Sequence, residues 1–118
     1  MNQLPILERR RIEALVLKKV YEVLRERSGE EEAQAAIGEA VTRSAIDQGK
    51  VFADELGRTP DLQDFADILP LWTKDNALEI EVLSQGKDHF DFNVKRCRYS
   101  EMYRDMGLGH IGHLLSCN

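Results

Sequence analysis

Cysteine is scarce in this sequence, where Cys97 and Cys117 are the only two among 118 residues. Two cysteines form at most one disulfide, so the chain is not a disulfide-rich secreted domain, and a chain of this length folds without such a crosslink. Long apolar runs are also missing: none approaches the roughly 18 residues of a membrane span, and no basic stretch followed by an apolar one opens the chain. These absences predict a cytoplasmic protein with free thiols and no membrane association.

Positive charge is also in short supply, because 16 Lys and Arg stand against 21 Asp and Glu, for a net charge of -5 at pH 7. Binding to nucleic acid requires a basic surface, so this balance excludes general nucleic-acid binding. The run Arg9-Arg10-Arg11 lies beside Glu8 and Glu13 and is typical of a solvated helix face. With 42% hydrophobic residues and no repeat or low-complexity tract, residues 1–118 predict one globular domain.

The first half of the chain predicts two long helices joined by a short turn. After Pro5, apolar side chains recur at helical spacing up to Ser28-Gly29, and a second pattern runs from Glu30 to about Leu56. The short connection favours an antiparallel helix pair. The stripe expected to face the core from the first helix consists of Ile12, Leu15, Val16, Val20, Val23 and Leu24.

Two glycines, Gly38 and Gly49, lie inside the second predicted helix, where each costs up to about 1 kcal/mol relative to alanine. We expect close packing at both, with a ligand touching the backbone as the alternative at Gly49. Thr59-Pro60-Asp61 is a helix-start signal, and Pro70 is expected to end the resulting helix over residues 61–69. The side chains expected to pack from this helix are Leu62, Phe65, Ala66 and Leu69.

The second half of the chain predicts a β-hairpin followed by one or two short helices. Apolar and polar residues alternate from Leu78 to Val82 and from Phe90 to Val94, on either side of the turn-like segment of residues 85–88. A helical pattern follows Arg98, and a final turn spans residues 110–115. The fold class is therefore α+β, with a long antiparallel helix pair and shorter helices packed on a small antiparallel hairpin. Its exposed edge favours a homodimer or an added strand.

Cys97 stands where the hairpin ends and the next helix begins. Arg96 and Arg98 flank it, and positive charge at a helix start lowers a thiol pKa and favours a nucleophilic thiolate. The alternative is a small buried hydrophobic residue, the usual role of a lone cysteine.

Several segments together carry a resemblance to a known family over nearly the whole chain. They are the opening Leu4-Pro5-Ile6-Leu7-Glu8-Arg9-Arg10, Leu62-Gln63-Asp64-Phe65-Ala66, Leu71-Trp72, Phe92-Asn93-Val94-Lys95-Arg96-Cys97-Arg98-Tyr99-Ser100-Glu101-Met102-Tyr103 and Leu115-Ser116-Cys117-Asn118. With these segments the sequence resembles the L-2-amino-thiazoline-4-carboxylic acid hydrolase family. Family members continue past the Ser-Cys-Asn segment with an Arg-Asp pair and a Cys-Asp-Phe-Arg segment. The resemblance thus implies a further C-terminal part, either absent from a truncated form or present as a separate, associating segment.

The resemblance implies hydrolytic opening of a five-membered thiazoline ring to an N-carbamoyl cysteine, without a cofactor. Such a reaction needs a nucleophile, a proton donor and a cation for the substrate carboxylate. The residues expected to act in catalysis are Cys97, Glu101 and Cys117. Those expected to contact the small carboxylate substrate are Arg96, Arg98, Asn93, Tyr99, Asn118 and Trp72.

Structural alternatives accompany these roles. In the structural alternative, Glu101 forms an ion pair with Arg98 or Arg104 and has no catalytic role. Tyr99 would then be a core residue with a polar tip, and Trp72 would pack between the strands and the helices. Two non-enzymatic functions also stay open, namely a small-molecule sensor without turnover and an interaction module stabilised by zinc. The ligand set for that metal would be His110, His113, Cys117 and Cys97.

Overall fold

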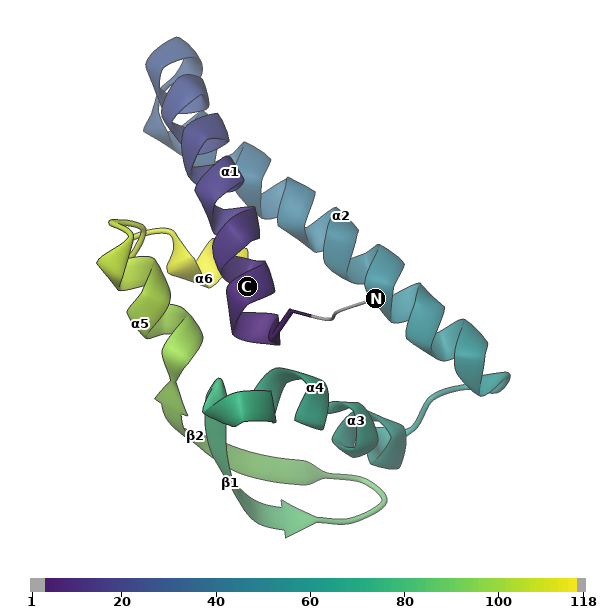
Figure 1. Cartoon of the computed structure of the whole chain (residues 1–118). Coiled ribbons are helices and arrows are strands. Elements are labelled where there is room, and N and C mark those ends of the chain that lie inside the picture. The colour runs from purple at the N-terminus through teal and green to yellow at the C-terminus, as the bar shows by residue number, and fades with distance from the viewer. Residues whose placement is uncertain (1–3, 117–118) are drawn as a thin grey trace.

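The structure is a computed structural model that describes residues 4–116, so Cys117 and Asn118 lie outside the described residues. Helix α1 spans Ile6–Ser28 and helix α2 spans Glu30–Leu56. The two helices meet at Gly29 and diverge toward the far end of α2, as Figure 1 shows. Ala14 of α1 and Ala33 of α2 are almost fully buried, and the two helices are in contact. The predicted antiparallel pair is confirmed.

Most of the face of α1 expected in the core is exposed, and of its six residues Leu24 alone packs against the core. Ile12, Val16 and Val23 are 45%, 62% and 45% exposed, whereas Ile6, Ala14 and Tyr21 are buried on the opposite side. The helix carries apolar side chains on both faces, and helical spacing alone does not say which face meets a neighbour. The contacts with α2 and with the later helix α5 decide it.

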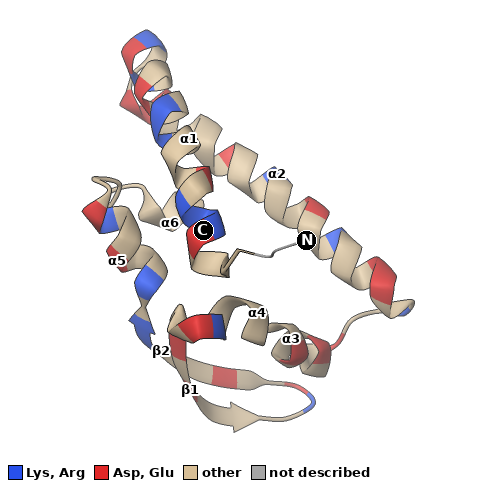
Figure 2. Cartoon of the chain, viewed as in Figure 1, with Lys and Arg blue, Asp and Glu red and all other residues tan. Residues whose placement is uncertain are grey.

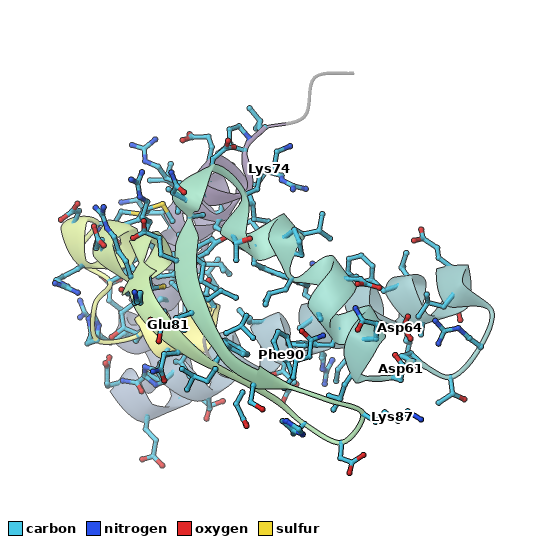
Figure 3. The ribbon with its side chains drawn as sticks, turned by 90° about the horizontal axis from the view of Figure 1, so that it is seen from below. Asp61, Asp64, Lys74, Glu81, Lys87 and Phe90 are labelled. Atoms are coloured by element: carbon cyan, nitrogen blue, oxygen red, sulfur yellow. The ribbon has the colours of Figure 1, made fainter. Side chains whose placement is uncertain are left out.

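A layer of short elements follows the helix pair. Helix α3 spans Leu62–Ile68, α4 spans Pro70–Thr73, and the 3-10 turn η1 spans Lys74–Asn76. The N-cap of α3 is Asp61, which lies close to Asp64 in Figure 3. The Asp61 carboxylate accepts a hydrogen bond from the Asp64 amide at 3.0 Å, and the Asp64 carboxylate accepts one from the Asp61 amide at 2.9 Å. This reciprocal capping box fixes the start of α3.

Two expectations for this region are corrected by the structure. Phe65 is 44% exposed rather than part of the packed face, and the buried position one residue earlier is held by Asp64. Arg58 donates two hydrogen bonds to the Asp64 carboxylate, at 2.7 and 2.6 Å, which explains why a charged side chain tolerates this site. Pro70 follows the end of α3 as predicted, but it also opens α4, since proline fits the first turn of a helix.

The predicted hairpin is present and longer than expected, with β1 at Leu78–Gln85 and β2 at Phe90–Cys97. The strands pair antiparallel with Ile80 opposite Val94, and the Gly86 amide donates to the His89 carbonyl at 2.9 Å across the turn. Within the described residues the sheet has these two strands alone, and Figure 1 shows it lying beside α3 and α4.

The chain then returns to the helix pair through α5, Arg98–Asp105, and α6, Gly112–Leu115. Helix α5 packs against α1, and α6 packs against α2. The buried side chains of α5, α6 and the segment between them complete the core together with those of α1 and α2; they are Tyr99, Tyr103, Leu108, Ile111 and Leu115. The α+β fold class is confirmed, and its core lies where α1, α2, α5 and α6 meet.

Charged residues of both signs are interspersed along α1 and α2 in Figure 2, without a continuous basic face. Within residues 4–116, no helix has both the length and the apolar character that crossing a membrane requires.

Candidate active-site pocket

A large pocket opens between the diverging helices and the layer beneath them. Its volume is about 880 Å³, and we call it the central pocket. All helices and both strands border it, and most of its lining side chains are apolar. Representative walls are Val16 of α1, Val41 and Phe52 of α2, Leu69 before α4 and Leu115 of α6. A pocket of this size and character suits a small organic ligand.

Cys97 lines the central pocket and is half-buried. It is the last residue of β2 and the N-cap of α5, as the junction in the sequence predicted. The Arg98 amide donates to the Ala77 carbonyl at 2.9 Å, and the Ser100 hydroxyl donates to the Cys97 carbonyl at 2.9 Å. These bonds fix the backbone on both sides of the thiol, so Cys97 borders a cavity at a helix start.

Tyr99 and Trp72 also line this pocket, and they are linked to each other. The Tyr99 hydroxyl donates to the Trp72 carbonyl at 3.0 Å, and the Trp72 ring lies 6.3 Å from the ring of Phe52. Burial raises the pKa of Tyr99 to about 12, against an opposing effect of the positive charge of Arg10. Tyr99 is therefore a neutral phenol at physiological pH that serves both the core and the pocket wall.

Arg96 and Glu101 lie apart from the residues that line the pocket. Arg96 donates to Glu101 twice, from Nε at 2.9 Å and from Nη2 at 3.0 Å, and the two side chains are 48% and 41% exposed. The hydrogen bond from Arg96 holds the pKa of the Glu101 carboxyl below its usual value. Strand alternation turns Arg96 away from its neighbour Cys97, so the structure brings this ion pair together at the surface. The partner of Glu101 is Arg96, not Arg98 or Arg104 as the structural alternative held.

Arg98 and Asn93 are not among the pocket-lining residues either. Asn93 is exposed on β2. Arg98 is half-buried, and its buried Nε has no hydrogen-bond partner among the described residues. The structure thus places Cys97, Tyr99 and Trp72 at the pocket and leaves Arg96, Arg98, Asn93 and Glu101 outside its lining.

Sequence reasoning missed two charged residues of the pocket, Arg10 and Glu13. Arg10 Nη1 lies 2.7 Å from Glu13 Oε1; the Arg10 side chain is 18% exposed and that of Glu13 is 54% exposed. A solvated face was expected for both. Helical spacing could have placed Arg10 on the buried side of α1, because it lies four residues after buried Ile6 and four before buried Ala14.

Histidines and cysteines do not gather into a metal site within the described residues, where no three His, Cys, Asp or Glu side chains are placed to hold an ion. His110 Nε2 lies 3.0 Å from the Tyr21 hydroxyl, which also donates to Glu30. The other proposed ligands, His113 and Cys97, are in helix α6 and at the central pocket. Cys117, like the substrate-binding candidate Asn118, falls outside the described residues.

Cys97 thus combines a half-buried thiol at a helix start with an apolar pocket of small-molecule size in an α+β fold. The family model for L-2-amino-thiazoline-4-carboxylic acid hydrolase matches residues 9–118, and the chain belongs to this family. No curated protein and no solved structure matches the chain.

Proposed function

We propose that this chain hydrolyses the ring of a small thiazoline or cyclic amidine-like carboxylate, of the 2-amino-thiazoline-4-carboxylate type, in the central pocket. The observation that carries the proposal is the position of Cys97, half-buried at the start of α5 and bordering a cavity of about 880 Å³. Membership of the hydrolase family supports the reaction class and the substrate class.

The proposed chemistry uses Cys97 as the nucleophile. Its thiolate adds to the ring carbon that carries the amino group, and the bond from that carbon to the ring sulfur breaks. The ring sulfur leaves as a thiol after taking a proton, which gives an isothiourea on Cys97. Water then adds to the same carbon, the Cys97 thiolate departs, and an N-carbamoyl cysteine is released. The sum is the addition of one water molecule, without oxidation or reduction.

The surroundings of Cys97 support this role. Cys97 is the N-cap of α5, and most of the side chains that line the pocket with it are apolar. Tyr99 is a phenol held neutral by burial, and its hydroxyl donates to the Trp72 carbonyl, so it forms a fixed part of the pocket wall rather than a base.

Turnover tests this proposal directly. The protein is incubated with L-2-amino-thiazoline-4-carboxylate, the new thiol is titrated with a chromogenic reagent, and N-carbamoyl cysteine is identified by mass spectrometry. We expect Cys97→Ser to lower the rate by at least about 100-fold, since a hydroxyl is a much weaker nucleophile here. Acid quenching of the wild type should trap the isothiourea on the peptide that contains Cys97.

The same assay separates the competing interpretations. Full activity of folded Cys97→Ser would reject this nucleophile, and loss of activity in Cys117→Ser alone would assign the reaction to the other thiol. Saturable binding without product would favour the sensor function.

One domain over residues 1–118, a cytoplasmic location and homodimer formation stay predictions. The exposed apolar residues Val82, Leu83 and Val94 on the hairpin support association through this sheet. Light scattering on the purified protein measures the oligomeric state.

A further inference from the structure

The charged lining of the central pocket is confined to one turn of α1. Arg10 is the single Lys or Arg among the described residues that border the pocket, and Glu13 is the single Asp or Glu. All the other lining residues are apolar or neutral polar. An anionic ligand in this cavity therefore meets one full positive charge, and it comes from α1 rather than from the segment around Cys97.

The side chain of Arg10 is held in place and only slightly exposed. It lies on the buried side of α1, its exposed fraction is 18%, and its contact with Glu13 runs from Nη1 to Oε1 at 2.7 Å. A guanidinium has five N–H donors in a planar fork that suits a carboxylate. The bond to Glu13 occupies one of these donors.

Arg10 also acts on the part of the pocket that holds the thiol. Its charge lowers the pKa of Tyr99, opposing the larger effect of burial, and the negative charge of a Cys97 thiolate raises it. Tyr99 thus lies within electrostatic range of both groups. Arg10, Tyr99 and Cys97 all border the central pocket, so one ligand in it has access to all three.

Resting on the proposed function, we propose that Arg10 binds the carboxylate of the substrate and makes the pocket selective for small anions over neutral analogues of the same ring. Glu13 holds the guanidinium in the empty pocket. Its side chain is 54% exposed, so the incoming carboxylate displaces it toward solvent at little cost. One carboxylate replaces another on Arg10, and the buried positive charge stays paired throughout.

Ligand binding, rather than turnover, tests the role of Arg10. The experiment uses the full chain with Cys97→Ser, which prevents turnover, and two ligands: L-2-amino-thiazoline-4-carboxylate and its uncharged 4-carboxamide. Trp72 is the only tryptophan and lines the pocket, so its fluorescence reports occupancy, with isothermal titration calorimetry as a second readout. We expect the carboxylate to bind about 10- to 100-fold tighter than the carboxamide, the ratio for hydrogen bonds between charged groups.

Arg10→Gln should remove this preference, mainly by weakening carboxylate binding while carboxamide binding changes little. Arg10→Lys keeps the charge without the fork and should retain part of the preference. The matched control is Arg11→Gln, which makes the same charge change on the next residue of α1. Arg11 is 52% exposed, pairs with Glu8 at 3.5 Å and does not line the pocket, so this variant should bind both ligands like its parent.

Each outcome decides the matter. If Arg10→Gln still prefers the carboxylate over the carboxamide, Arg10 does not bind the carboxylate, even when the turnover assay supports the hydrolase. If Arg10→Gln and Arg11→Gln lose carboxylate affinity equally, the effect comes from the overall charge of the protein and the assignment fails. If Arg10→Gln does not fold, as circular dichroism would show, Arg10→Lys decides: an unchanged preference there overturns the need for a guanidinium fork. If the Cys97→Ser parent binds neither ligand and the wild type releases no thiol in the turnover assay, the proposed function fails and the role of Arg10 fails with it.

Discussion

Replacing Gly49 with alanine should stabilise the protein. Gly49 lies inside α2, its φ is not positive, and a Cβ built at this position meets nothing within 4 Å. The close packing expected at Gly49 is therefore absent in the described structure, whereas the residue borders the central pocket. An alanine here keeps the helical backbone and meets no steric conflict.

The magnitude follows from the helix alone. Glycine inside a helix costs about 0.5–1 kcal/mol relative to alanine, because it loses more backbone entropy on folding. With no new contact to add or subtract, we expect Gly49→Ala to raise the free energy of unfolding by this amount. For a chain of this size the midpoint of thermal unfolding should rise by roughly 2–4 °C.

Gly38 provides the matched control on the same helix. A Cβ at Gly38 would lie 3.4 Å from Leu114 Cδ2, so part of the helical gain is offset by adjustment of that side chain, and Gly38→Ala should stabilise less. Both variants are compared with the wild type by circular dichroism in urea and on heating. A Gly49→Ala protein less stable than the wild type would refute the reasoning, since it would show that this side of α2 is covered. Weaker ligand binding by a stabilised Gly49→Ala would instead support the ligand contact considered for Gly49.

Two further predictions concern the fold. The hydrogen bonds from Arg58 are the main reason that the pKa of Asp64 is about 2 in the folded protein, below the ordinary 3.8. Because the pKa is lower in the folded state, the Asp64 carboxylate stabilises the fold fully above pH 3.8. This stabilisation is lost as the pH falls through about 2. Urea unfolding between pH 5 and pH 2 should therefore show the wild type losing more stability than Asp64→Asn, and parallel curves would contradict this. Leu108 is 1% exposed, so Leu108→Ala should cost about 2–5 kcal/mol in calorimetry, and a loss under about 1 kcal/mol would contradict its place in the core.

Several parts of the fold and the site were predictable because they depend on neighbours along the chain. Gly57, at φ 68°, ends α2 where the sequence placed the end, and the alternation around Ile80 and Phe92 predicted the hairpin. Cys97 at the junction of strand and helix was predicted in the same way. The alternation also contained the information that Arg96 and Cys97 point to opposite sides of β2, which separates the guanidinium from the pocket.

The sequence by itself determined the two long helices, the hairpin and the α+β class, because helix caps, turns and apolar periodicity act over a few residues. Only the tertiary structure decided which face of α1 is buried: α2 and α5 pack on this helix, Ala14 is 1% exposed and Val16 on the other face is 62% exposed. Arg10 lies on the buried face and lines the pocket, whereas Arg96 pairs with Glu101 at the surface. Spacing along a helix assigns residues to faces, but the shape of the neighbouring elements determines which face they cover.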